Sequence, residues 1–509
     1  MTDIGEVSHQ KSSSEEELEE AEDVAHRILY DPQKWPYLKK YRILFLVALP
    51  AFLTPLSNTS LYPAISDMKE EFEATAIIIN LLLGIYIIFR GIAPIFWSSY
   101  SDQLKTRKRV YLASLLIYTM SNIICGFAKN AIILVLFGII QSIGISAALS
   151  LGGGTVSDVF IPAERGKAYA IYLVGYFIAL ASGPNIGGLI TNSLGWRWVF
   201  YILAILGSAT LLLITSFLPE TFREPEEKFT SKPHIIRIIR ESHPQSPSEE
   251  SKSFTQKKSY NPLLPFKLLL QLNITFSILS KSLVNLVIYS QSILIVKMFS
   301  YYYNVSSLYL LFAYISPPVG YLIGSFIAGI YSDRLAGYES DVETRKEREM
   351  KKEEKKRLMK EETTEIMQEI LENRDIIYRF PVMRIYVAFY SSLIVPLFIV
   401  TYGWLTQIKV HILIPLIISF IAGIGLQGQS NCISTYLIDA NPGKSASALA
   451  LSDFISYFFV AILIILVNPL VDLIGMGFTY TIMAFFSILS IILLVIVFKN
   501  DERWRGVNL

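Results

Sequence analysis

Charged residues are scarce in this chain of 509 residues, because Asp, Glu, Lys and Arg together make up only 17% of it. Soluble domains carry nearer a quarter, and here hydrophobic residues reach 52% with a mean hydropathy of +0.44. The composition excludes an ordinary soluble domain and indicates that lipid is the main solvent. The formal net charge is only +2 and the charges sit in a few segments, which argues against nucleic acid as a partner.

Cysteine and histidine are equally rare. Cys125 and Cys432 lie inside apolar runs, so the chain lacks the material for a disulfide framework or a cysteine-rich metal site. The five histidines are scattered and form no HExxH pattern. The nearest approach to a phosphate-binding loop, at 443–445, has Ile438 where that motif requires glycine. We therefore expect no enzyme activity, no metal and no cofactor.

Long apolar runs fill most of the sequence. A hydrocarbon core about 30 Å thick needs about 20 apolar residues of helix, and windows of that length recur twelve times here. We expect an all-α polytopic protein embedded in a lipid bilayer. The predicted spans are 42–65, 77–100, 110–128, 131–153, 167–190, 198–218, 272–296, 307–331, 384–404, 410–436, 446–468 and 474–498.

Basic residues in the short loops predict the orientation. The cluster 105–109 follows the second span, and Arg165 and Lys167 follow the fourth. By the positive-inside rule these loops and both termini are cytosolic. The predicted parts are a tail at 1–41, a six-helix bundle at 42–218, a cytosolic linker at 219–271, a second bundle at 272–498 with a charged cytosolic insertion at 332–383, and a tail at 499–509.

One short pattern occurs at the cytosolic ends of both the second and the eighth predicted span. In each copy a small residue precedes an aspartate by four positions, and basic residues follow it. The aspartates are Asp102 and Asp333, with Arg107 and Arg334 after them. Such a weak internal repeat suggests two six-helix halves. We expect these residues to hold an inward gate through charge pairs and interactions with helix ends.

The repeated loop resembles that of the major facilitator superfamily, which carries a G-x-x-x-D-R-x-G-R-R type pattern between its second and third helices. A more specific match is Gly183-Pro184-Asn185-Ile186-Gly187-Gly188 in the fifth span, which is similar to the GPxxGG signature of the antiporter branches. With 195–200 and 218–221 in the same order, the chain resembles fungal twelve-span drug:proton antiporters. It is most similar to the quinidine-resistance and dityrosine-transporter branch.

The resemblance implies the major facilitator fold, with two pseudo-symmetric halves, and a monomer that works by alternating access. It implies proton-coupled export of drug-like compounds, organic anions or dityrosine-like aromatic amino-acid derivatives, with Gly183, Pro184, Gly187 and Gly188 in the gate. The plasma or prospore membrane is the expected location, with the vacuolar membrane as an alternative. One departure is Gly138, which stands where the family has an arginine implicated in proton coupling.

Three ionisable residues lie well inside predicted spans, namely Arg90, Lys281 and Asp453. Arg90 precedes Asp102 by twelve residues, about 18 Å along a helix, and a charge at that depth costs roughly 2.5 to 3.5 kcal/mol in lipid. We expect it to face a wet cavity, the alternatives being snorkelling or a structural pair with Asp453.

Two cations against one carboxylate favour a substrate with carboxylate groups. Asp453 is the expected proton acceptor, with Arg90 also taking part in the coupling. Eight residues are predicted to bind the substrate in a central cavity: Asn58, Arg90, Gln141, Tyr172, Tyr176, Lys281, Asn285 and Tyr289.

A second function class remains open from the residues alone. A transporter-like nutrient receptor would have the same spans but would signal through a cytosolic segment, for which 332–383 is the candidate. Its dense Glu and Lys are also typical of a solvated spacer helix.

Overall fold

The computed structural model describes residues 31–73, 76–223, 263–298, 303, 313–335 and 381–504. These ranges contain helices joined by turns, without any strand. Ten of the helices are long and apolar enough to cross a membrane. One of them, α15 (Ser445–Trp504), reverses at Gly475 with a φ of 82° and so makes two crossings, and the 28-residue α4 (Ala76–Gln103) makes another. The predicted twelve-helix, all-α membrane fold is confirmed.

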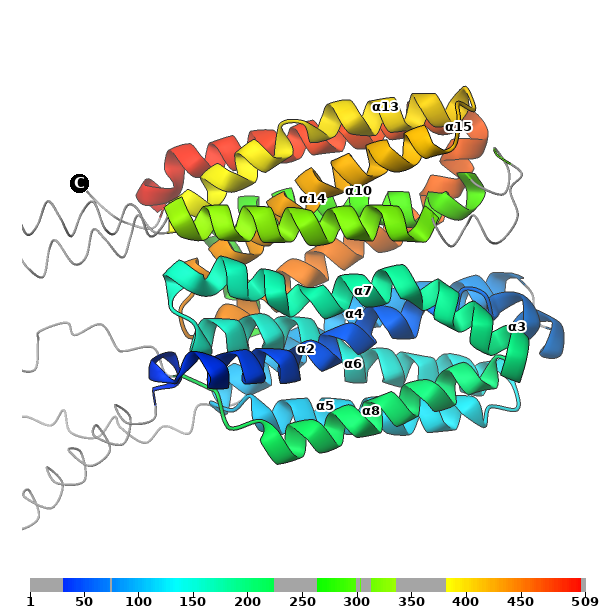
Figure 1. Cartoon of the computed structure of the whole chain (residues 1–509), viewed down its shortest axis with the longest axis horizontal. Coiled ribbons are helices and arrows are strands. Elements are labelled where there is room, and N and C mark those ends of the chain that lie inside the picture. Colours follow the sequence, from blue (N-terminus) through cyan, green and yellow to red (C-terminus); the bar gives the residue numbers. More distant parts are fainter. Residues whose placement is uncertain are drawn as a thin grey trace, which may run out of the picture.

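The helices form two groups that lie one above the other in Figure 1. The start of α2 and the end of α15 lie at the same end of the bundle, which we call the tail end; the opposite end, near α3, is the far end. The first group contains η1 (Pro32–Lys34), α2 (Tyr37–Thr59), α3 (Ile65–Glu71), α4, α5 (Lys108–Gly126), α6 (Ala131–Val159), α7 (Pro162–Leu194) and α8 (Arg197–Phe217). The second contains η2 (Leu264–Leu270), α10 (Leu272–Lys297), the helix Ala313–Leu335, the segment Pro381–Gln407 that ends in α13 (Val395–Gln407), α14 (Leu413–Ala440) and α15.

Several helices extend beyond the predicted apolar windows. The first begins at Tyr37 instead of 42, and the fifth spans Pro162–Leu194 instead of 167–190. Polar first and last turns continue a helix into the interface, where hydropathy no longer marks it. Most of the predicted linker 219–271 and insertion 332–383 lies outside the described residues, as do residues 1–30 and 505–509 of the tails.

The GPxxGG segment packs α7 against the far end of α2. A methyl carbon added at Gly183 would lie 1.8 Å from the hydroxyl oxygen of Thr59, and one at Gly187 would lie 2.0 Å from the carbonyl oxygen of Ser60. Only glycine permits so close a helix contact. Pro184 is buried within α7 next to this contact. The structure thus gives these residues a packing position within the first half, and their part in gating stays a prediction.

Gly187→Ala is expected to destabilise the protein by about 1 to 3 kcal/mol, because the added methyl group collides with backbone that cannot move aside cheaply. Thermal unfolding in detergent measures the effect. Gly188→Ala is the matched control, since its added carbon would meet only Pro63 at an ordinary contact distance of 3.7 Å. Equal unfolding temperatures for the two variants would contradict the packing role.

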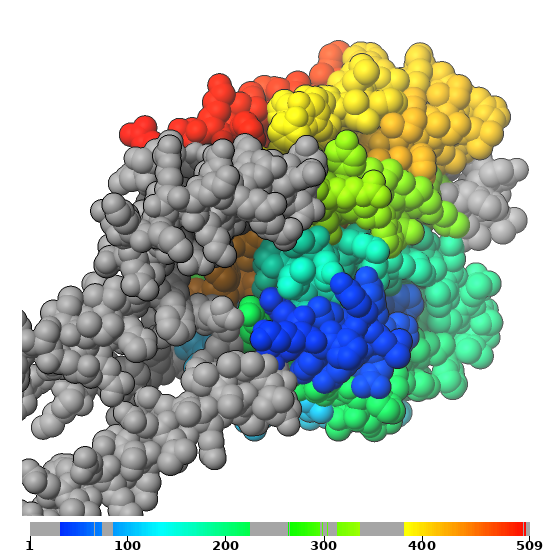
Figure 2. Space-filling view, turned by 60° about the vertical axis from the view of Figure 1, so that its left-hand side comes forward, coloured from blue at the N-terminus to red at the C-terminus, as the bar shows by residue number. Residues whose placement is uncertain are grey.

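The two halves meet along two main seams. On one, α4 packs against α15. On the other, α7 meets the helix Ala313–Leu335, which lie against each other in the turquoise and yellow-green of Figure 2. At that seam a methyl carbon on Gly329 would lie 2.5 Å from the carbonyl oxygen of Gly166. The functional groups described next lie along these seams.

Candidate functional site

Two neighbouring cavities lie between the halves and share Tyr176 and Tyr289 in their walls. The larger has a volume of about 360 Å³ and reaches towards the far end, where Ile65 of α3 and Asn468 of α15 line it. The smaller, of about 100 Å³, lies around Lys281 and Asp453. Of the residues predicted to bind substrate, the larger cavity contains Asn58, Arg90, Tyr176 and Tyr289, and the smaller contains Tyr176, Lys281, Asn285 and Tyr289.

Arg90 is 3% exposed and lines the larger cavity from α4. Its Nε and Nη2 atoms have no hydrogen-bond partner among the described residues. These two atoms lie on one edge of the guanidinium plane, the edge that binds a carboxylate through two parallel hydrogen bonds. The guanidinium carbon lies over the ring of Tyr457, 5.3 Å from its centroid. A buried cation thus presents an unused bidentate edge next to open space.

Lys281 and Asp453 form an ion pair between α10 and α15, with 3.3 Å between Nζ and Oδ1. Both side chains are mostly buried, at 7% and 16% exposure. Lys281, Asn285 and Tyr289 follow each other at intervals of four residues and so lie on one face of α10. Asp453 and Tyr457 have the same spacing on α15. The two helices therefore present a matching ladder of polar groups to the cavities.

Two predicted cavity residues lie elsewhere. Gln141 donates a 2.7 Å hydrogen bond to Asn122 of α5, and Tyr172 donates a 2.8 Å bond to the carbonyl oxygen of Ala148 on α6. Neither lines the two cavities described above. Both pack helices within the first half, because their side chains point to a neighbouring helix and not to the central axis. They are not part of the site that we propose.

Sequence reasoning also missed residues that do line the cavities. Tyr62, Tyr314 and Asn468 line the larger cavity, and Tyr457 lines the smaller one. Only Tyr457 carried a usable signal, since it follows the ionisable Asp453 by one helical turn. The others lie near predicted loop ends, where tyrosine and asparagine are ordinary interfacial residues.

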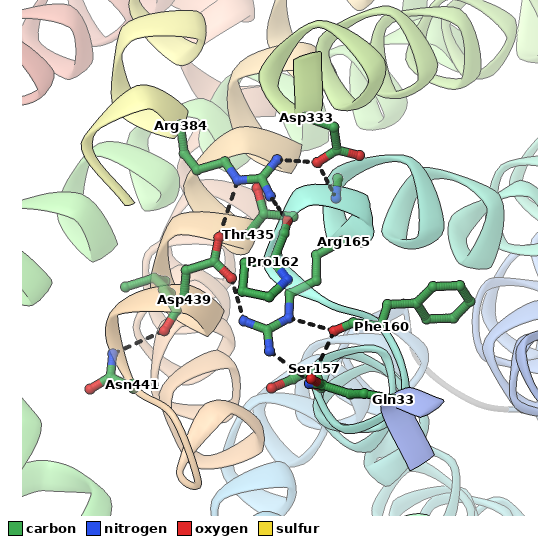
Figure 3. Close-up of polar contacts among 12 residues, drawn as sticks. Gln33, Ser157, Phe160, Pro162, Arg165, Asp333, Arg384, Thr435, Asp439 and Asn441 are labelled. Carbon is green, nitrogen blue, oxygen red and sulfur yellow. Dashed lines mark hydrogen bonds and ion pairs between the residues drawn. The ribbon is translucent and has the colours of Figure 1, made fainter. Parts of the chain in front are cut away.

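A second polar cluster closes the tail end of the bundle (Figure 3). Arg384, fully buried, contacts Asp333 at 2.5 Å and Asp439 at 3.2 Å, all within the second half. Arg165 of α7 reaches across from the first half to Asp439 at 2.6 Å. We call Arg165, Asp333, Arg384 and Asp439 the inter-half clasp. It joins the two halves by charges that are almost entirely removed from water.

Backbone groups of α7 complete the clasp. Asp333 accepts hydrogen bonds from the backbone N–H groups of Gly166 at 2.9 Å and Lys167 at 2.7 Å. Arg384 donates to the carbonyl oxygen of Pro162 at 2.6 Å. Asp333 therefore sits at the positive N-terminal end of a helix from the other half. Arg334, the neighbouring predicted gate residue, is exposed and has no printed place in the clasp.

The first copy of the repeated pattern makes the mirror-image contact. Asp102 of the first half accepts hydrogen bonds from the hydroxyl of Ser447 at 2.5 Å and its backbone N–H at 3.2 Å, at the start of α15. Arg107 holds Asp102 at 2.6 Å and Asp158 at 2.9 Å. Burial alone would lower the pKa of Arg107, but Asp158 and Asp102 outweigh it and raise that pKa above its usual range. Each half thus places an aspartate on a helix N-terminus of the other.

A membrane bundle of two helical halves, closed at one end and with a polar cavity between them, is a secondary transporter. The family model of the Major Facilitator Superfamily matches residues 47–340. The chain belongs to this superfamily, and the protein is a transporter, not an enzyme.

Individual relatives agree with this assignment. The chain is 25% identical over 479 residues to Citrate exporter 1 of Aspergillus niger, covering 92% of this chain and 87% of the relative. It is 30% identical over 220 residues to Quinidine resistance protein 3 of Saccharomyces cerevisiae, covering 43% and 31%. The structure of the human organic anion transporter MFSD10 (TETRAN) superposes with a TM-score of 0.58 at 15% identity, over 90% of this chain and 100% of that one. The predicted superfamily and fungal branch are confirmed.

Proposed function

We propose that the protein exports small organic anions together with protons, by alternating access around the cavity at Arg90. One observation carries this proposal, namely the unpartnered Nε and Nη2 edge of a buried arginine that faces a cavity between the halves. Leaving a buried charged donor unsatisfied is costly, so a bound partner is expected in the working cycle. A carboxylate matches the edge in charge and in geometry.

The charge balance of the cavities supports an anion over a cation. The two cations Arg90 and Lys281 face one carboxylate, Asp453, which Lys281 already neutralises. A cationic drug would meet an uncompensated positive charge in a site of low dielectric, where like charges repel strongly. The relative named as a citrate exporter fits an organic anion, whereas the relative named for quinidine resistance covers less than half of this chain.

The Lys281–Asp453 pair supports coupling to protons. When Asp453 binds a proton it loses its charge, and the Lys281 ammonium becomes free to donate to the substrate. Proton and anion would therefore bind in the same state and cross together. This assignment replaces the arginine that the family has at the position of Gly138. We further propose a monomer in the plasma or prospore membrane, with both termini in the cytosol.

Counterflow in proteoliposomes tests the proposal, with labelled citrate and benzoate as anions and quinidine as the cation. Saturable exchange of at least one anion without exchange of quinidine is the expected result. Quinidine exchange at the same rate as the anions would reject the anion preference.

Asp453→Asn tests the coupling, because asparagine mimics the protonated carboxyl group. The variant is expected to keep anion exchange but to lose its dependence on pH between 5 and 8, roughly the range in which buried carboxyl groups titrate. An unchanged pH profile would show that protons act elsewhere. The receptor alternative predicts a different outcome, since removal of residues 336–380 would leave flux intact and abolish a cellular response.

A further inference from the structure

Arg90 is held by an aromatic ring from the opposite half. Its guanidinium carbon lies over the ring of Tyr457 on α15, 5.3 Å from the centroid, and the tyrosine is 7% exposed. At this distance the cation is attracted to the negative face of the ring, more strongly when both groups are removed from water. Such a contact engages the face of the guanidinium and leaves its edges available for hydrogen bonds.

The ring of Tyr457 is fixed from two further directions. A methyl carbon on Gly91 would lie 2.8 Å from the Cβ atom of Tyr457, so α4 and α15 touch immediately beside Arg90. On its other side the ring meets Tyr289 of α10 edge to face, with centroids 6.0 Å apart and planes at 72°. The Tyr289 hydroxyl also donates to the Tyr457 hydroxyl at 3.4 Å. The ring therefore has little freedom to turn away from Arg90.

Arginine has a long, flexible side chain, and a free one loses affinity because it must be ordered when the ligand binds. A ring that already orders the guanidinium removes this cost. It also decides which edge faces the cavity, and here that edge is the unpartnered Nε and Nη2 pair.

We propose that Tyr457 is a positioning residue for anion binding, which holds the bidentate edge of Arg90 towards the cavity. The inference rests on the proposed function, and it adds a regulatory consequence. Because Arg90 belongs to the first half and Tyr457 to the second, the anion site is complete only while α4 and α15 stay in contact beside Gly91. Anion affinity is thereby coupled to the closure of this seam.

The test compares Tyr457→Leu with Tyr457→Phe in proteoliposomes, with labelled citrate and benzoate as probes. Leucine removes the aromatic face, so KM for the transported anion is expected to rise by about tenfold while the maximal rate changes less than about twofold. Phenylalanine keeps the face and loses only the hydroxyl, so it should stay within about threefold of wild type. Phe458→Leu is the matched control, since this neighbouring ring on α15 is 60% exposed at the lipid side.

Gly91→Ala supplies a second variant that leaves the tyrosine in place. Its methyl group would force α4 and α15 apart beside Arg90, so KM should again rise. An unchanged KM in both Tyr457→Leu and Gly91→Ala, or equal losses in Tyr457→Phe and Tyr457→Leu, would overturn the positioning role. If wild-type protein carries neither anion, the proposed function fails and this inference with it; wild-type flux with indifferent variants rejects the inference alone.

Discussion

Arg90→Gln lowers the saturable flux of organic anions by about a hundredfold in the expected result. The substitution removes two charge-assisted hydrogen bonds to the carboxylate, each worth roughly 1.5 to 3 kcal/mol, and about 2.8 kcal/mol suffices for a hundredfold loss. Folding should be little affected, because the Nε and Nη2 atoms that disappear have no partner among the described residues. Initial rates of citrate and benzoate uptake, at matched amounts of reconstituted protein, measure the effect.

Two further variants sharpen this experiment. Arg90→Lys keeps the charge but lacks the planar fork, so we expect an intermediate loss of about tenfold. Arg109→Gln removes an exposed arginine at the tail end and should leave the flux unchanged. Full activity in Arg90→Gln would show that the buried guanidinium has a structural role and that the anion binds elsewhere.

Arg384→Gln opens the tail end and destabilises the second half. The variant leaves the carboxylates of Asp333 and Asp439, which are 10% and 3% exposed, without their shared cation. Breaking a buried ion pair from one side costs about 3 to 5 kcal/mol. Asp333→Asn should have a smaller effect, because its amide oxygen can still accept the hydrogen bonds from the backbone of α7.

Cys432 offers a readout for this opening. It is 1% exposed on α14, with its sulfur 3.8 Å from the carbonyl oxygen of Ala328, next to the residue at the seam with α7. In a Cys125→Ser background, maleimide should label Cys432 faster in Arg384→Gln than in the parent, and the thermal midpoint should fall. Arg165→Gln breaks the ion pair between the halves but leaves Arg384 on Asp439, so it should speed labelling with a smaller loss of stability. Labelling and stability that match the parent in all variants would refute the clasp as a gate.

Much of the candidate site was predictable as single residues but not as contacts. The repeated pattern pointed to Asp102 and Asp333 as gate residues, and both lie on helix N-termini of the opposite half. The hub of the clasp, Arg384, was missed because in sequence it is one more basic residue at the end of a charged insertion. Arg165 entered the prediction only as a marker of orientation.

The sequence by itself determined the solvent, the number of spans and the depth of the ionisable groups. These properties depend on apolar runs of about 20 residues and on a rise of 1.5 Å per residue, which act locally along the chain. The burial of Arg90, 12 residues from Asp102, follows from the same arithmetic.

Only the tertiary structure decided which inward faces meet. It placed Gln141 and Tyr172 against neighbours within the first half, paired Lys281 with Asp453, and set the ring of Tyr457 against Arg90. Helices that all carry apolar surfaces give no rotational signal in a bilayer, because lipid and protein neighbours are equally apolar. The orientation of each helix about its axis is fixed instead by close contacts such as those at Gly91 and Gly187, and these contacts decide which polar groups reach the cavity.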